Sequence, residues 1–237
     1  MPPTMNKQQT LTQVLRVLEK HYAPAEPDVK PVLEQLLYAV LREGTTRELA
    51  DVAYRTLQDR FFDWNEIRVS SPQEIASALS GLPGAGDKAP RVIGILQHVF
   101  ETTFSYKIDD IDKKGLKHAA KQLGQFAEAG DFAVAWVVQR ALGGHALPLD
   151  GPTLRVLRRL GVIDAEDQHL ESLRSTLEHY VPKARGALFS DVVSLVAKDY
   201  CWAENPDCTN CPLLKDCPTG QERVSTSAAK PTRLKPR

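Results

Sequence analysis

Apolar residues recur at helical spacing along almost the whole chain between residues 6 and 200. Leu11, Val14, Leu15 and Leu18 lie three or four residues apart, so they share one face of a helix. The same spacing returns near 32–40, 88–104, 113–126, 131–142, 152–160, 167–180 and 184–199. Segments rich in glycine and proline, such as GLPGAG and GGHALPLDGP, separate these stretches. Since alternating strand patterns are absent, the sequence predicts an all-α fold of about ten short helices.

The chain has only four cysteines, and all of them lie in one short segment. Cys201, Cys208, Cys211 and Cys217 follow the spacing C-x6-C-x2-C-x5-C within 17 residues. Thiolates this close together are typical of a metal-binding loop, and iron–sulfur clusters and structural zinc are its two usual occupants. Disulfides are the alternative, but they are typical of small secreted domains, whereas 237 residues can bury a sizeable core.

The distribution of apolar residues argues against a membrane span and indicates where in the cell the protein is expected. No apolar run approaches the ~20 residues that cross a bilayer, and the start, MPPTMNKQQT, has no apolar signal core. The sequence therefore predicts a cytoplasmic protein without a membrane partner, in a compartment that keeps thiols reduced.

The end of the chain is basic. Lys and Arg number 30, as do Asp and Glu, yet residues 223–237 hold five basic residues and no acid. The remaining chain thus has 25 basic against 30 acidic residues, a net charge of −5. Without apolar periodicity, residues 219–237 are predicted to be a disordered tail. Such a tail is either a phosphate-seeking arm or a solubilising terminus.

One segment places a lone carboxylate at the start of a helix. Residues 126–164, FAEAGDFAVAWVVQRALGGHALPLDGPTLRVLRRLGVID, predict a turn at Gly130, a helix to about Leu142, a loop, and a second helix that Asp150 opens and Gly161 closes. An Asp directly before a helix is most often an N-cap, because its oxygen accepts from the free N–H groups of the first turn.

The cysteine spacing and this segment together resemble the endonuclease III superfamily of base-excision-repair DNA glycosylases. These are helix–hairpin–helix enzymes with a C-terminal [4Fe-4S] loop. In that family a catalytic Asp opens a helix twenty residues after the last hairpin Gly, as Asp150 follows Gly130 here. LLYAVLREGTTRELA, upstream, resembles an early helix of the family and the turn after it.

The resemblance implies a two-lobed helical fold. A helical barrel domain is expected over residues 28–143, with the hairpin near 126–138. The second domain is expected to combine residues 1–27 with residues 144–218, and to carry the cluster on loop 201–217.

The resemblance also implies a function. The protein is expected to be a monomer, associated with the nucleoid, that binds double-stranded DNA and removes a damaged or mismatched base. Asp150 would stabilise positive charge on the deoxyribose and orient or deprotonate an attacking water. The cluster would be held by the four cysteines and would be structural.

Three departures from the family bear on activity. Phe132 stands where lyase members have a nucleophilic Lys, so AP-lyase activity is not expected, and its ring is expected to line the base pocket. Glu128 replaces a hairpin glycine and brings a carboxylate to the phosphate-binding turn. The segment between the first two cysteines is acidic. The alternative is a catalytically weak or inactive relative that acts as an iron–sulfur module for binding DNA lesions or a partner.

A second glycine-rich turn, in residues 82–96, resembles the hairpin sequence of the family. LPGAGDKAPRVIGIL contains Lys88, but Gly86 precedes Asp150 by 64 residues, which is far more than the family spacing. We therefore predict a surface turn in which Lys88 opens a helix.

Overall fold

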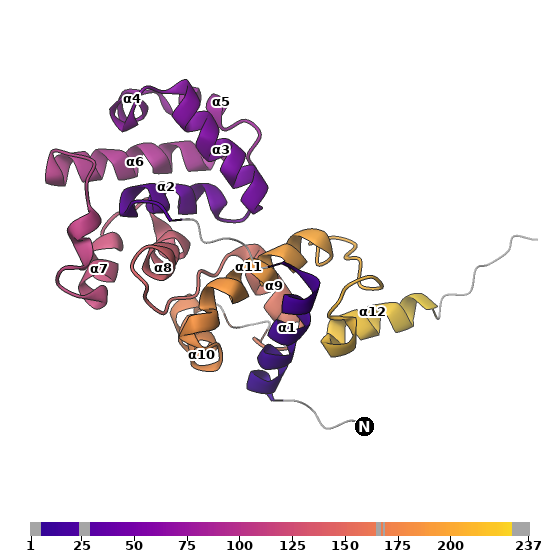
Figure 1. Cartoon of the computed structure of the whole chain (residues 1–237). Helices are drawn as coiled ribbons and strands as arrows, with labels where there is room; N and C mark the ends of the chain where they lie inside the picture. Colours follow the sequence, from indigo (N-terminus) through magenta and orange to yellow (C-terminus); the bar gives the residue numbers. More distant parts are fainter. Residues whose placement is uncertain (1–5, 24–28, 165–166, 168, 229–237) are drawn as a thin grey trace, which may run out of the picture. The chain divides into compact units, whose positions relative to one another are not determined.

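The computed structural model describes residues 6–23, 29–164, 167 and 169–228, and in these ranges all regular structure is helical (Figure 1). The α-helices are α1 (Lys7–His21), α2 (Val32–Arg42), α3 (Arg47–Arg60), α4 (Trp64–Val69), α5 (Pro72–Ala78), α6 (Ala85–Thr103), α7 (Leu116–Leu123), α8 (Gly130–Arg140), α9 (Gly151–Arg159), α10 (Leu170–Tyr180), α11 (Lys183–Asp199) and α12 (Pro218–Ala228). Two 3-10 turns, η1 (Asp109–Asp112) and η2 (Leu214–Asp216), accompany them. The all-α prediction is therefore confirmed. No helix among these is both long and apolar enough to cross a membrane.

The chain forms two compact units. The central unit comprises Glu26–Asp150, and the terminal unit combines Met1–Ala25 with Gly151–Arg237. The functional lobes predicted over 28–143 and over 1–27 with 144–218 remain a prediction.

The central unit is built around α2 and α6, which pack against each other (Figure 1). Helices α3, α4 and α5 lie on one side of this pair, and α7 and α8 lie on the other (Figure 1). The sequence of α2, VLEQLLYAVLR, explains its place: ten of its eleven residues are buried, and a helix that is apolar nearly all round is stable only when other helices surround it.

A polar pair lies inside this core. Gln35 of α2 is 1% exposed, and its side-chain oxygen accepts a hydrogen bond of 2.9 Å from the indole N–H of Trp136 on α8. Because a buried N–H needs an acceptor, this bond fixes how α8 rotates against α2. Trp136 is itself 7% exposed and lies in the apolar core of the unit.

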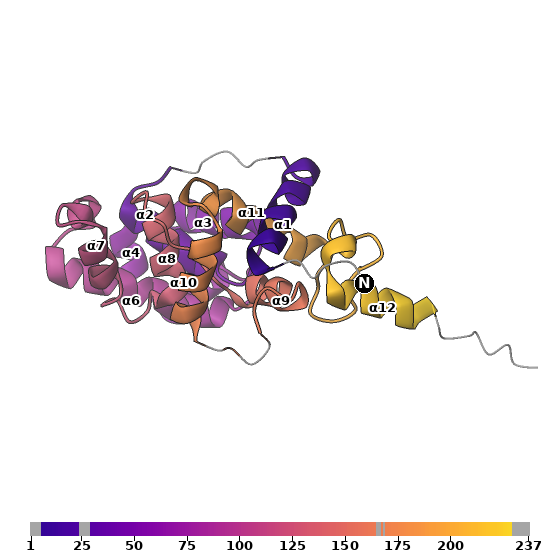
Figure 2. The ribbon, with the colours of Figure 1, turned by 90° about the horizontal axis from the view of Figure 1, so that it is seen from below.

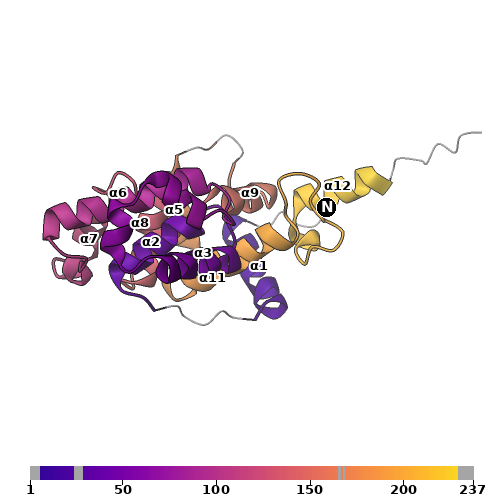
Figure 3. The ribbon, with the colours of Figure 1, turned by 90° about the horizontal axis from the view of Figure 1, so that it is seen from above.

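In the terminal unit, α9 packs on α11, and α1 contacts α10, α11 and η2. The cysteine loop joins α11 to α12 and is drawn in gold and yellow in Figure 2 and Figure 3. Helix α1 begins with a capping box, in which Asn6 and Gln9 each accept a hydrogen bond from the other's backbone N–H. Its buried stripe of Leu11, Val14 and Leu18 faces the rest of this unit.

The tail differs from its prediction. Disorder was expected from residue 219, but α12 spans Pro218–Ala228. Pro218 suits the first position of a helix, and the backbone N–H of Gln221 donates to the Cys217 carbonyl at 3.0 Å. Residues 229–237, which hold four of the five basic residues of the tail, lie outside the described residues.

We expect Gln35→Leu to lower the free energy of unfolding by about 1–3 kcal/mol, because the Trp136 indole N–H would stay buried without this acceptor. Urea unfolding measures the loss. The control is the double variant Gln35→Leu with Trp136→Phe, in which neither partner remains. Its loss should be smaller than the sum of the two single losses, and strictly additive losses would contradict a direct bond.

Candidate functional site

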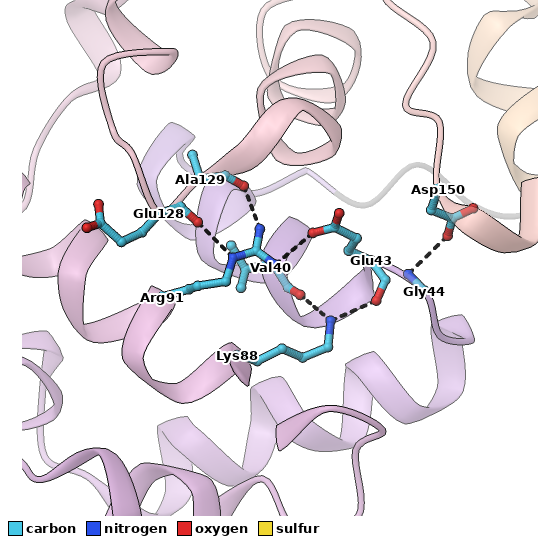
Figure 4. A network of polar contacts seen from close by, with 8 residues as sticks. All are labelled: Val40, Glu43, Gly44, Lys88, Arg91, Glu128, Ala129 and Asp150. Carbon is cyan, nitrogen blue, oxygen red and sulfur yellow. Dashed lines mark hydrogen bonds and ion pairs between the residues drawn. The ribbon is translucent and has the colours of Figure 1, made fainter. Parts of the chain in front are cut away.

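Asp150 is the last residue of the central unit and directly precedes α9. It is 7% exposed, and its Oδ2 accepts a hydrogen bond of 3.0 Å from the backbone N–H of Gly44 (Figure 4). The loop that brings it there is anchored by Gln139, whose side-chain amide donates to the Ala146 carbonyl at 2.9 Å. Leu149 is buried beside it. The carboxylate is therefore held in place by both its own loop and the segment after α2.

Gly44 is required by the backbone conformation. Its φ of 72° lies in the left-handed region, which side chains with a Cβ rarely adopt, although a Cβ there would meet nothing within 4 Å. This conformation turns the chain after α2, and the Gly44 N–H then points to Asp150. The left-handed backbone conformation, and not a lack of space for a side chain, thus explains why residue 44 is a glycine.

Lys88 caps the end of α2. Its ammonium donates to the carbonyls of Val40 at 2.6 Å and Glu43 at 2.7 Å (Figure 4). A cation at the carboxyl end of a helix satisfies carbonyls that have no partner within the helix and meets the negative end of the dipole. The bonds fix the segment from which Gly44 contacts Asp150.

This position corrects the prediction of a surface lysine. Lys88 is 6% exposed, and burial lowers its pKa from 10.5 to about 8. Glu43 and Asp150 partly oppose this effect, because their negative charges favour the protonated amine. The prediction was wrong because the carbonyls that Lys88 binds lie at the end of α2, 45 and 48 residues away in the sequence.

Arg91, one helical turn after Lys88, joins three segments. Its Nε donates to the Glu128 carbonyl at 2.8 Å and its Nη2 to the Ala129 carbonyl at 2.7 Å. On the other side, its Nη1 contacts the Glu43 carboxylate at 2.8 Å (Figure 4). Sequence reasoning missed Arg91. The only signal was a second cation three residues after Lys88, on the same face of the helix.

The turn that Arg91 holds connects α7 to α8. It ends at Gly130, whose φ is 72°, and a Cβ there would lie 3.1 Å from Nη2 of Arg91. The turn predicted at Gly130 is therefore present, and the guanidinium occupies the space beneath it. The Glu128 side chain packs over Gly94 of α6, where a Cβ would come within 2.6 Å of its Cγ.

Phe132 lies in the apolar core of the central unit, and its role in lining a base pocket remains a prediction. It is 4% exposed and belongs to the core cluster of the central unit. Its ring stacks on Trp136, with centroids 5.8 Å apart and an angle of 28° between the ring planes. An aromatic ring on the buried face of α8 is stabilised by leaving water.

A cavity of about 440 Å³ in the central unit lies elsewhere. Its lining comes from the end of α6, η1 and α7, and includes Lys107, Lys114 and His118. None of the predicted site residues lines it. The polar network around Asp150 and this basic cavity are therefore separate features.

The cysteine loop is tied to α9 by two arginines. Arg155 donates to the Cys201 carbonyl at 2.8 Å. Arg159 donates to the Trp202 carbonyl at 2.6 Å and to the Ala203 carbonyl at 2.9 Å. It also donates to the sulfur of Cys201 at 3.3 Å. The first part of the loop is therefore positioned by the helix that follows Asp150.

None of the four cysteines forms a disulfide. Burial, followed by the negative charge of the other three thiolates, raises the pKa of Cys211 to about 11. Burial and neighbouring thiolates likewise raise the pKa of Cys217. Within the described ranges no group of three or more Cys, His, Asp or Glu side chains stands ready to hold a metal ion. Since the negative charge of neighbouring cysteines raises the pKa of Cys211 and Cys217, a cation among them would favour the thiolate form of these two.

The donor set matches a sulfur-bound metal in its chemistry. The sulfur of Cys217 accepts from the backbone N–H of Gly220 at 3.3 Å, and the sulfur of Cys201 accepts from Arg159. Hydrogen bonds of this kind stabilise negative charge on ligand sulfurs. A Cβ at residue 220 would lie 3.4 Å from the Cys217 sulfur.

Comparison with known proteins gives one match in sequence and several in structure. No protein-family model matches the chain. The chain is 36% identical over 87 residues to endonuclease III from Bacillus subtilis (strain 168), a stretch that covers 37% of this chain and 39% of that protein. The match thus spans well under half of the curated relative.

The structural matches cover nearly the whole chain. A non-covalent endonuclease III–DNA complex matches with a TM-score of 0.74 at 21% identity, covering 93% of this chain and all of that one. A trapped endonuclease III–DNA covalent intermediate matches with a TM-score of 0.73 at 21% identity and the same coverage. A thermostable thymine-DNA glycosylase matches with a TM-score of 0.64 at 16% identity, covering 90% of this chain and 97% of that chain.

At identities of 16–21% the structural matches establish the fold alone. The 87-residue stretch shows in addition that part of the sequence is similar to endonuclease III. The chain has the helical fold of endonuclease III, and the resemblance to the endonuclease III superfamily predicted from the sequence is confirmed.

Proposed function

We propose that this protein is an endonuclease III-like DNA glycosylase of base-excision repair, which binds double-stranded DNA and removes a damaged or mismatched base. The observation that carries the proposal is the placement of Asp150. Its carboxylate is 7% exposed, accepts the Gly44 N–H, and follows the left-handed turn at Gly130 by twenty residues. The protein–DNA complexes among the structural matches support the choice of substrate.

In this proposal Asp150 acts on the sugar of a base turned out of the duplex. As the bond to the base breaks, positive charge develops on the deoxyribose, and a nearby carboxylate stabilises it. The same oxygen pair orients a water, or takes its proton, as the water attacks the sugar carbon. The Gly44 N–H occupies one lone pair of Oδ2 and keeps the carboxylate from rotating.

In this proposal the mechanism uses water, because neither of the two described residues considered for covalent chemistry, Phe132 and Lys88, offers a free amine. Lyases of the family form a Schiff base through a lysine at the position where this chain has Phe132. The Phe132 ring has no amine and is enclosed in the core. Lys88 is a buried amine with a pKa of about 8, but two carbonyls engage its ammonium. These two placements support the proposal of a monofunctional glycosylase.

We propose further that Cys201, Cys208, Cys211 and Cys217 hold a [4Fe-4S] cluster. The four unpaired thiols and the N–H donors to two of their sulfurs support this. When bound, the cluster crosslinks the loop between α11 and α12 and stabilises its fold. Structural zinc is the alternative occupant.

A second candidate is a relative that binds DNA lesions or a partner without removing a base. Glu128 favours it, because it adds a carboxylate to the turn that would meet a phosphate. Asp150 favours the enzyme. The experiments below separate the two.

We expect Asp150→Asn to lower the single-turnover rate of base release by at least about a hundredfold, because the variant loses the charge that stabilises the sugar cation. The amide oxygen still accepts from Gly44, so the fold should persist. The assay uses duplexes with oxidised, alkylated or mismatched bases, and measures release of each base.

The matched control is Asp59→Asn, which removes an exposed carboxylate from the end of α3. It should release bases at the rate of the unaltered protein. Binding of lesion duplexes without release from any of them would favour the binding module over the enzyme.

We expect borohydride to trap no covalent adduct between the protein and an abasic duplex, because a Schiff base needs a reachable amine. Gel electrophoresis of the reduced mixture detects an adduct. The outcome against this view is an adduct that disappears in Lys88→Met, which would identify Lys88 as a nucleophile. A lysine-dependent lyase serves as the positive control.

We expect the protein purified without oxygen to be brown and to contain iron and acid-labile sulfide in equal amounts. Cys211→Ser should lose most of this iron and unfold at a lower temperature, because one ligand of the crosslink is gone. Thr209→Ser, a change in the same loop, should keep its iron. A colourless protein that contains zinc would show that the cluster assignment is wrong.

A further inference from the structure

We infer that Arg91 is a positioning residue that sets the turn before α8 and the carboxylate of Asp150 in one arrangement. The inference rests on the proposed function for its consequence, but its structural part can be tested alone. No bond described for Arg91 reaches Asp150, so Arg91 acts on it through Glu43 and Gly44 (Figure 4).

The first link joins Arg91 to the turn. Its Nε and Nη2 donate to the consecutive carbonyls of Glu128 and Ala129. The planar guanidinium presents these two N–H donors side by side. The two bonds therefore fix both the orientation of the turn and its distance from α6. Gly130 has no Cβ to displace the fork. The helix that begins there, α8, therefore starts from a fixed point on α6.

The second link joins Arg91 to the end of α2. Nη1 pairs with the Glu43 carboxylate at 2.8 Å, and both side chains are about two-thirds covered, at 27% and 32% exposure. An ion pair shielded in this way is stronger than one in open solvent. Glu43 is held at its other end too, since its carbonyl accepts from Lys88 at 2.7 Å. Its position is thus over-determined.

The third link reaches the carboxylate. Gly44 follows Glu43 directly and donates its N–H to Asp150. The carbonyl held by Lys88 and the N–H held by Asp150 belong to one planar peptide unit, the one between Glu43 and Gly44. A displacement of Glu43 therefore moves the donor that fixes Asp150. One guanidinium on α6 thus links the turn that would meet the DNA backbone to the group that would act on the sugar.

Arg91→Lys tests the inference because it keeps the charge but loses the fork. One ammonium on a shorter reach does not serve three acceptors on two sides. We expect amide hydrogen exchange of Gly44 and of residues 128–132, measured by NMR, to become roughly tenfold faster. We also expect the Kd for a duplex with an uncleavable abasic analogue to rise roughly tenfold.

The matched control is Arg68→Lys, in the same unit. Arg68 also has a multiply bonded guanidinium, with donors to Asn65, Tyr106 and Gln97, and no bond described for it reaches the network. It should leave the Gly44 exchange rate and the Kd unchanged, even where it lowers the melting temperature. A merely structural role for Arg91 would shift the melting temperature in both variants and the Gly44 exchange in neither.

Glu43→Gln separates the links and serves if Arg91→Lys does not fold. Its amide oxygen still accepts from Nη1 but lacks the charge. Exchange at Gly44 should accelerate while residues 128–132 keep their rates, because their bonds to Arg91 remain. Wild-type exchange at Gly44 in both Arg91→Lys and Glu43→Gln would overturn the inference. Absence of base release by the unaltered protein would refute the proposed function and leave the exchange result standing.

Discussion

Two cations on one face of α6 hold the ends of other elements in the central unit. Lys88 donates to carbonyls at the end of α2, and Arg91 donates to carbonyls of the turn before α8. Both sets of carbonyls would otherwise be polar groups in a largely buried setting, where an unpaired acceptor is costly. Burying the Lys88 amine has its own cost, which the lowered pKa expresses. The two short hydrogen bonds offset part of it.

This arrangement explains which parts of the protein the sequence could predict. Helices follow from the spacing of neighbouring residues, so the all-α fold was predictable from local pattern alone. Gly130 and Asp150 were found because a fixed interval joins them. Lys88 and Arg91 have partners that lie 37 to 48 residues away in the chain. No local pattern contains such contacts, and a lysine in a glycine-rich turn therefore suggested a surface residue.

Helix α12 is another element that the local sequence pattern could not predict. Residues 218–228 have no apolar period, and isolated helices of this length are marginal in water. Contacts with the cysteine loop supply the additional stability that this helix needs. The side-chain amide of Gln221 donates to the Lys215 carbonyl at 2.6 Å, and the backbone N–H of Gly220 donates to the Cys217 sulfur. The helix is therefore stabilised by the loop before it, and the composition that predicted disorder contains no information about that loop.

The departures from the family are accommodated by the packing of this chain. Phe132 replaces an amine, but its ring gains a stacked position on Trp136 in the core. Glu128 adds negative charge to the turn, but its backbone carbonyl accepts from Arg91 and its side chain packs over Gly94. Since both changes are absorbed without losing the left-handed turn or the bond between Gly44 and Asp150, the carboxylate stays positioned while covalent chemistry through residue 132 is removed. In the proposed function this positioned carboxylate would activate a water, and with no amine at residue 132 a glycosylase without lyase activity is the form that we propose.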